Sequence, residues 1–269
     1  NAGRIIYENE PSGIPIKGER SDAMALTSAE AYRAYKNILK TARIEIVLVG
    51  NSISDRCIEL MTERFSNMER EGIYEIIKNT SPAKPETAEK TERLEVAQSK
   101  MVMAYKTDIT DYGVSRLFSA ILGGTAFSML FKTVREKLSL CYYCASNYID
   151  SKRTMLVDSG VELANYETAR DEILRQLDAL RSGDFTDEEM DSALLSLVNS
   201  VRGTGDTPSG WVGWYFYLLC SGLDRTPQQE AEYYRSMFAD RQKLRQRLMD
   251  AAKSLQLDTV YLMQQREGE

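Results

Sequence analysis

The spacing of apolar and polar positions predicts the order of helices and strands along the chain. Residues 3–26 carry several prolines and glycines without apolar periodicity, so we expect an irregular segment there. Thr27 and Glu30 then form the pattern of a capping box, and apolar side chains recur at helical spacing over 27–42. This stretch predicts the first helix.

Strand and helix signals continue after it. The run at 44–50 is almost entirely β-branched or aliphatic and ends in glycine, which is typical of a buried strand. Ser54 or Asp55 is the expected cap of a second helix. Residues 79–92 are polar, contain two prolines and lack periodicity, which indicates a linker, whereas 94–105 alternates loosely, as a strand does.

The middle of the chain combines a long helical stretch with two strands. A helix is expected from about 112 to 137, with a break at Gly123-Gly124, followed by strands at 140–149 and 154–162. A polar turn separates the two strands.

Helices dominate the last hundred residues. One helix is expected to end at Gly183, and Thr186 with Glu189 forms another capping box at the start of the next. The remaining expected elements are helices at 208–221, 227–238 and 239–254 and a closing strand at 260–262. Strands and helices without strict alternation predict an α+β fold with a mixed, mostly antiparallel sheet covered by helices.

Composition excludes several classes of function. The 40 acidic and 34 basic residues give a net charge of -6, and no basic stripe is available to bind a nucleic-acid backbone. No apolar run is long enough to cross a membrane. Four scattered cysteines do not make a disulfide framework, so we expect a reducing, cytoplasmic setting. The chain contains no histidine, and it therefore cannot be a histidine-dependent hydrolase or form a histidine-ligated zinc site.

The segment 121–142 carries a resemblance to a known family. It contains a Leu-Gly-Gly step, a Ser-x-Leu-Phe element, the pair Arg135-Glu136 and, seven residues after the arginine, Tyr142 in an aromatic strand. This arrangement resembles a signature of M16-type (pitrilysin/insulinase-like) peptidases. The chain is most similar to the second-half, non-catalytic domain, and to the inactive M16-like proteins of Gram-positive bacteria.

The resemblance implies a domain organisation and a fold. Residues 1–78 would be the C-terminal part of a first M16-like domain, with residues 1–2 expected to be a tag remnant. Residues 79–92 would be the linker, and 93–269 a second, non-catalytic domain of the LuxS/metallohydrolase-like type.

The same resemblance implies roles for two residues. In the family the corresponding arginine and tyrosine hold the substrate backbone and help to polarise the scissile carbonyl, so Arg135 and Tyr142 are the expected substrate-binding residues. A guanidinium and a phenol are suitable donors to a carbonyl oxygen that gains negative charge. No catalytic residue, metal ligand or cofactor is expected in this chain. The implied partners are a peptide and a zinc-bearing, His-x-x-Glu-His subunit or domain, which would make a heterodimer.

Other interpretations compete with these roles. Without the family resemblance, an arginine beside Glu136 usually makes a surface ion pair and a strand tyrosine usually packs, which would leave a purely structural or assembly protein. Cys141 and Cys144 have CxxC spacing, but on a regular strand residues three apart point to opposite faces, so we expect the thiols to diverge. The aromatic run at 211–217 is expected to be mainly core, or else a peptide-binding wall.

Overall fold

A computed structural model describes residues 1–74 and 80–266. The end of the expected first domain, 75–78, and the first residue of the expected linker, 79, lie outside the described residues. The fold is α+β, as predicted. Its strands are β1 (Ala88–Leu94), β2 (Ser99–Lys106), β3 (Cys141–Ile149), β4 (Thr154–Val161) and β5 (Gln256–Gln265).

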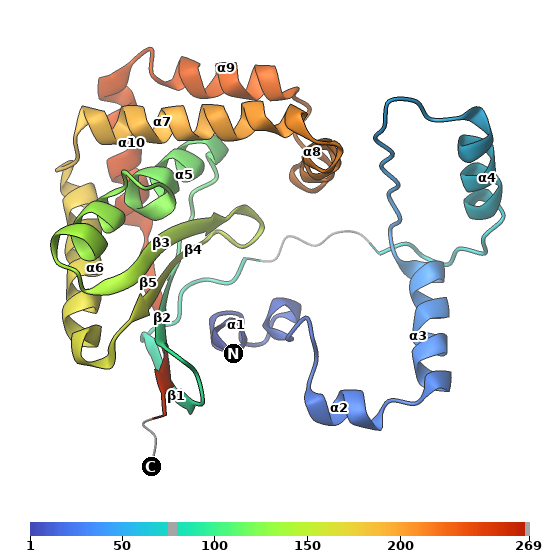
Figure 1. The fold of residues 1–269 in the computed structure, drawn as a ribbon, viewed down its shortest axis with the longest axis horizontal. Helices are drawn as coiled ribbons and strands as arrows, with labels where there is room; N and C mark the ends of the chain where they lie inside the picture. The colour runs from blue at the N-terminus through green and yellow to red at the C-terminus, as the bar shows by residue number, and fades with distance from the viewer. Residues whose placement is uncertain (75–79, 267–269) are drawn as a thin grey trace. The chain divides into compact units, whose positions relative to one another are not determined.

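The five strands form one sheet in the order β1-β5-β2-β4-β3 (Figure 1). β1 pairs with β5 in parallel, and the other three pairings are antiparallel. The expected mixed, mostly antiparallel sheet is therefore confirmed. β1 and β3 are its two edge strands among the described residues.

The other regular elements of the described residues are helical. The α-helices are α1 (Ala2–Ile6), α2 (Arg20–Ala25), α3 (Ser28–Thr41), α4 (Asp55–Ser66), α5 (Tyr112–Ser119), α6 (Tyr166–Ser182), α7 (Asp187–Arg202), α8 (Pro208–Ser221), α9 (Pro227–Met237) and α10 (Arg241–Ser254). Two π-helical segments, η2 (Ala120–Gly124) and η3 (Phe131–Lys137), follow α5. Short 3-10 turns are η1 (Pro11–Gly13), η4 (Asp150–Lys152), η5 (Leu163–Asn165) and η6 (Gly203–Asp206).

One face of the sheet carries the main core. Met101, Met103 and Tyr105 alternate along β2 and are almost completely buried against apolar side chains of α5, α6 and α10. Burying each such side chain contributes about 1.5–3 kcal/mol. On the other face, Ala104 packs with Ile6 in a small separate cluster, so α1 covers part of the sheet.

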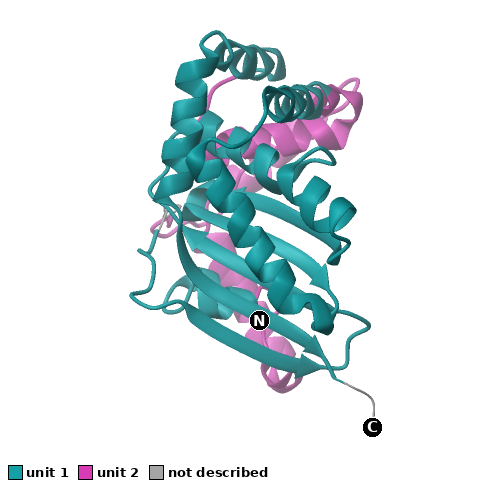
Figure 2. Cartoon of the chain, turned by 90° about the vertical axis from the view of Figure 1, so that its left-hand side faces the viewer, with its two compact units in different colours: residues 1–13, 79–202, 226–269 teal, residues 14–78, 203–225 magenta. Residues whose placement is uncertain are grey.

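The chain divides into two compact units, which are described separately (Figure 2). The first holds the whole sheet and comprises the described parts of residues 1–13, 79–202 and 226–269. The second comprises the described parts of residues 14–78 and 203–225, with α2, α3, α4 and α8. No described helix is both long and apolar enough to span a bilayer.

Helix ends agree well with the local signals. The Thr27 and Glu30 capping box of α3 is present, and Ser54 caps α4. α6 ends at Gly183, whose φ of 84° is the left-handed conformation that glycine adopts without strain. At the start of α7 the backbone N–H of Thr186 donates a 2.8 Å hydrogen bond to the Glu189 carboxylate, and the backbone N–H of Glu189 donates a 3.1 Å bond to the Thr186 hydroxyl.

Three expectations about secondary structure are wrong. Residues 3–26, expected to be irregular, include α1 and α2. Residues 44–50 are not a strand, because no strand among the described residues pairs with them. Residues 88–92, expected to be linker, belong to β1. That edge strand is polar on both faces, so it lacks the apolar alternation of a half-buried strand.

Candidate functional site

The segment that carries the family-like motif packs tightly against β3. An added Cβ at Gly123 would lie 2.5 Å from the backbone nitrogen of Ser146, so only glycine allows η2 to approach the strand this closely. The Ser146 hydroxyl also donates a 2.8 Å hydrogen bond to the carbonyl of Ser119. The helical winding changes from α to π after Ser119, and the π-helical segment ends at Gly124, so the helix is interrupted at the expected Gly123-Gly124 step.

Arg135 lies in η3, immediately before β3. Its guanidinium carbon is 4.5 Å from the centroid of the Phe131 ring, and its Nε is 3.6 Å from a carboxylate oxygen of Glu136. The side chain is 37% exposed, so the stacked guanidinium still reaches solvent. Stacking on an aromatic face restricts the orientation of an arginine without neutralising its charge.

Tyr142 lies at a bulge on the edge strand β3. Cys141 is opposite Val161 and Tyr143 is opposite Gly160 on β4, so Tyr142 is an extra residue without a cross-strand partner. Its side chain is 74% exposed. The bulge therefore directs the phenol away from the packed sheet.

Arg135 in η3 and Tyr142 in β3 lie on adjoining segments of the chain. Among the described residues, neither a hydrogen bond nor a ring contact joins them. Their link is Cys141, the residue before Tyr142, because the positive charge of Arg135 helps to lower the pKa of that thiol. The structure thus places a guanidinium and a phenol on adjacent segments, with solvent access to both.

The two thiols do not diverge, contrary to the sequence-based expectation. The S–H of Cys144 donates a hydrogen bond to Cys141, and this bond is the main cause that lowers the pKa of Cys141 to about 7. The same bond and burial raise the pKa of Cys144, which is 3% exposed. The argument from strand geometry failed because it assumed a regular strand, and a bulge between the cysteines changes which faces they share.

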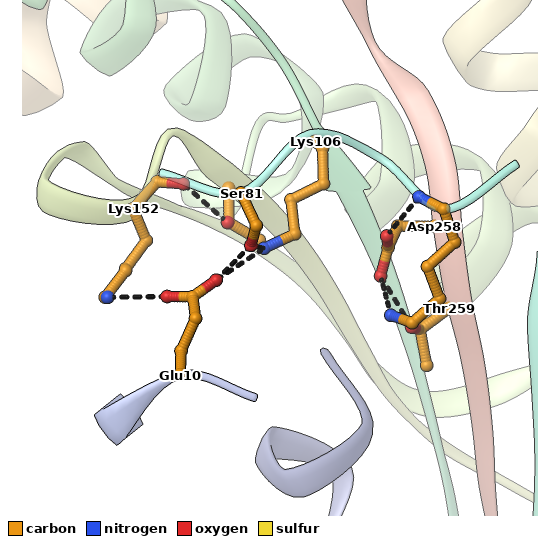
Figure 3. Close-up of polar contacts among 8 residues, drawn as sticks. Glu10, Ser81, Lys106, Lys152, Asp258 and Thr259 are labelled. Carbon is orange, nitrogen blue, oxygen red and sulfur yellow. Dashed lines mark hydrogen bonds and ion pairs between the residues drawn. The ribbon is translucent and has the colours of Figure 1, made fainter. Parts of the chain in front are cut away.

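A second polar cluster lies on the opposite face of the sheet (Figure 3). Glu10 accepts a 2.8 Å hydrogen bond from Nζ of Lys152 and another from the hydroxyl of Ser81. Nζ of Lys106 lies 4.0 Å from Glu10 and 4.5 Å from the centroid of the Tyr7 ring, and its side chain is only 4% exposed. Burial acts to raise the pKa of Glu10, but the hydrogen bonds and charges around it lower the pKa below its usual value.

Asp258 extends this polar cluster along β5. It accepts hydrogen bonds from the backbone nitrogen and Nζ of Lys84, at 3.0 and 2.8 Å, and from the hydroxyl of Thr259 at 2.7 Å. Figure 3 shows these contacts beside those of Glu10. The members of the cluster form hydrogen bonds and ion pairs with one another. These interactions hold residues 10 and 81–84 against the sheet. The cluster was not predicted from the sequence, because its members lie far apart along the chain. The only local indication of it was a carboxylate or ammonium group within an apolar strand.

The aromatic segment of α8 is only partly a core element. Trp214 is buried and its indole N–H donates a 3.1 Å hydrogen bond to the carbonyl of Arg225. Tyr215 and Phe216 are 47% and 60% exposed. The expectation of a mainly buried helix is therefore wrong for these two residues, because the apolar side chains surround the helix instead of forming one stripe.

The residues do not fit a zinc site. In the described part of the chain, no group of three or more cysteine, aspartate or glutamate side chains is arranged to hold a metal ion. The acidic side chains at the start of α7 have other partners: Glu189 caps the helix and Asp187 pairs with Arg245 at 2.7 Å.

Comparisons with known proteins agree with the resemblance to M16-type peptidases. The family model described as "Peptidase M16 inactive domain" matches residues 25–197. The Bacillus subtilis (strain 168) protein YmfF, described as a probable inactive metalloprotease, is 28% identical over 98% of this chain and 62% of its own length. A second protein of that strain, YmxG, described as an uncharacterized zinc protease, is 25% identical over 74% of this chain and 49% of its own length.

Solved structures show the same fold. A conserved protein from Enterococcus faecalis V583 superimposes with a TM-score of 0.85 at 23% identity, over 100% of this chain and 63% of that one. A peptidase M16 inactive domain from Pseudomonas fluorescens gives 0.72 at 15% identity, over 100% and 67%. The chain thus spans about two thirds of these relatives or less. Because the family model covers well over half of it, the chain belongs to the peptidase M16 inactive-domain family.

Proposed function

We propose that the chain is the non-catalytic half of an M16-type zinc metallopeptidase, which binds extended peptide beside Arg135 and Tyr142. The catalytic zinc would belong to a His-x-x-Glu-His subunit or domain that pairs with it. The observation that carries the proposal is the bulged edge strand: Tyr142 is 74% exposed on β3, and the guanidinium of Arg135 reaches solvent from the adjoining segment.

An edge strand is a suitable place for an extended peptide. The outer side of β3 faces no other described strand, and Tyr142, Ala145 and Asn147 are exposed along it. A peptide added there would gain main-chain hydrogen bonds irrespective of its sequence. Arg135 and Tyr142 would then contact carbonyl oxygens near the scissile bond, where fixed donors stabilise developing negative charge.

The organisation of the whole protein is part of this proposal. We retain the division into a first-domain tail at 1–78 and a second domain at 93–269, but of the expected linker at 79–92 the last five residues, 88–92, belong to β1. The compact units support a boundary near residue 79 but group residues 1–13 with the sheet and 203–225 with 14–78. Four cysteines outside any disulfide suit the proposed cytoplasmic setting.

A purely structural or assembly role is the alternative, and one observation favours it. Arg135 already stacks on Phe131 and lies near Glu136, as an arginine with only a packing role would. The peptide-binding and structural functions differ in the role of the exposed donors Arg135 and Tyr142. A structural role predicts that removing them changes no peptide affinity.

Peptide binding by single variants separates the two functions. Binding of labelled, unstructured peptides of 10–20 residues would be followed by fluorescence anisotropy. We expect Arg135→Ala to weaken binding about tenfold or more, because a charged donor to a carbonyl is lost, and Tyr142→Phe to weaken it less. Arg93→Ala is the matched control, since it removes the same charge from an exposed position on the opposite edge strand, β1. Equal affinities for all variants would favour the structural role.

The partner is tested by mixing. The chain would be combined with a His-x-x-Glu-His homologue from the same cell, and the size, zinc content and peptidase activity of the mixture would be measured. A stable mixed complex whose cleavage falls with Arg135→Ala supports the proposal. Cleavage by the homologue alone, unchanged by adding this chain, contradicts it.

A further inference from the structure

The bulge on β3 places two cysteine side chains on one face of the sheet. Cys141 is opposite Val161 and Cys144 is opposite Ser159. Val161 and Ser159 are two residues apart on a regular strand, so they point to the same face, and their partners do too. The packing agrees, because Cys144 belongs to the main core and Cys141 packs against it.

The surroundings give the two thiols different properties. Cys141 is half-buried, whereas Cys144 is 3% exposed. The hydroxyl of Ser159 lies within hydrogen-bonding reach of both thiols. Arg135 adds positive charge beside Cys141. An accessible thiol next to a cation, with a second thiol in contact behind it, is the arrangement of a nucleophile and a resolving partner.

Titration supports the same division of roles. The hydrogen bond from Cys144, aided by Ser159 and Arg135, lowers the pKa of Cys141 to about 7, so a large share of it is thiolate at neutral pH. The pKa of Cys144 is raised by the same bond and by burial, so it keeps its proton. Only the thiolate attacks an electrophile, and the proton on Cys144 holds that thiolate in place.

We propose that Cys141 and Cys144 form a redox-active pair that is oxidised by a hydroperoxide to an intramolecular disulfide. The thiolate of Cys141 attacks one peroxide oxygen of hydrogen peroxide, which breaks the O–O bond, forms a sulfenic acid and releases hydroxide. The sulfur of Cys144 then attacks the sulfenic sulfur, and its proton leaves with the displaced hydroxyl group as water. Two thiols lose two electrons and two protons, and one peroxide becomes two waters.

Because of the bulge, forming the disulfide would also affect the backbone around Tyr142. Closing the disulfide brings the sulfurs from hydrogen-bonding contact to about 2.05 Å, and the unpaired Tyr142 between them is the part of the backbone that can adjust. Oxidation would therefore fix the loop of chain that displays Tyr142. The redox chemistry needs no bound peptide, so its test is independent of the proposed function.

Mass spectrometry after peroxide treatment tests the pair in the wild-type chain. Trypsin releases both cysteines in the single peptide 138–152. We expect this peptide to lose about 2 Da and to resist alkylation after treatment with hydrogen peroxide, and to recover with a reductant. Cys57 and Cys220 are internal controls, because they are also only partly buried and lie elsewhere in the chain.

Variants assign the two roles. In Cys144→Ser, a sulfenic acid at Cys141 should accumulate and be trapped by dimedone, whereas the wild type should show little adduct because the disulfide forms. Cys141→Ser should abolish oxidation within the peptide. If dimedone labels Cys141 equally in the wild type and in Cys144→Ser, the resolving role is refuted.

A measurement without variants covers the case in which these substitutions unfold the chain. Iodoacetamide should alkylate Cys141 of the native wild type about threefold faster than an ordinary thiol at pH 7. This is the gain in thiolate fraction after allowing for the lower nucleophilicity of a less basic thiolate. Alkylation of Cys141 no faster than that of Cys57 and Cys220 would overturn the proposal.

Discussion

Gly123 and the backbone nitrogen of Ser146 are so close that a Cβ on the glycine would lie 2.5 Å from that nitrogen. The neighbour is main chain and cannot rotate away, so Gly123→Ala must push η2 from β3. We expect a loss of about 1–3 kcal/mol or more in the free energy of unfolding, measured by urea denaturation.

A second glycine provides the control for this substitution. Gly213 lies inside α8, and an added Cβ there would meet no atom within 4 Å. Gly213→Ala should therefore stabilise the chain by about 0.5–1 kcal/mol, because alanine is the better helix former. Equal effects of the two substitutions would show that helix propensity, and not the close approach to β3, explains Gly123.

Two buried tyrosines should respond oppositely to the loss of a hydroxyl. The hydroxyl of Tyr105 is buried and has no hydrogen-bond partner among the described residues, whereas that of Tyr148 donates a 2.9 Å bond to the carbonyl of Ile109. Tyr105→Phe should leave stability unchanged or raise it by about 1 kcal/mol, and Tyr148→Phe should lower it by about 0.5–1.5 kcal/mol. Thermal unfolding of both variants checks the signs. Destabilisation by Tyr105→Phe would indicate a water partner.

Arg181 joins α6 to the end of α10. Its guanidinium donates to the carbonyls of Ala252 and Leu255 at 3.2 and 2.8 Å, in the last turn and at the C-cap of α10. We expect Arg181→Met to cost about 1–3 kcal/mol, because it retains the packing of the stem and removes the donors. Arg175→Met on the same helix is the control, since among the described residues the guanidinium of Arg175 donates to Glu172 within α6. Similar losses from both would contradict a role specific to α10.

Local sequence signals predicted the ends of helices better than they predicted which strands pair with one another. The capping boxes at Thr27 and Thr186 and the glycine at 183 are defined by residues three or four apart, and each marks a helix end in the structure. β1 was missed because its place in the sheet depends on pairing with β5, about 170 residues later. Its polar sequence gave no apolar pattern to reveal that partner.

The candidate site shows the same limit. The spacing of Arg135 and Tyr142 was visible in the sequence, and the structure places both near solvent on adjoining segments. The contact between Cys141 and Cys144 was not predictable, because one unpaired residue reverses the face that every following side chain occupies. No local residue pattern marks that bulge.

Acid should weaken the chain through Glu10. Its pKa is lowered in the folded state, so its ionised form contributes stability above the unfolded pKa of about 4.3 and loses that contribution as the pH falls through the lower folded pKa. Glu10→Gln removes the contribution of the ionised carboxylate to stability. The stability difference between wild type and variant, measured by urea unfolding, should therefore be large at pH 7 and shrink below about pH 4.

Glu8→Gln is the matched control for this experiment. Glu8 is two residues away and exposed, so the same change of charge should alter stability little at any pH. Asp258 also has a lowered pKa, through hydrogen bonds from Lys84 and Thr259 that outweigh its burial, so wild type and Glu10→Gln should both still lose stability in acid. A Glu10→Gln difference that stays constant from pH 7 to pH 3.5 would mean that the side chain acts through packing and not through its charge.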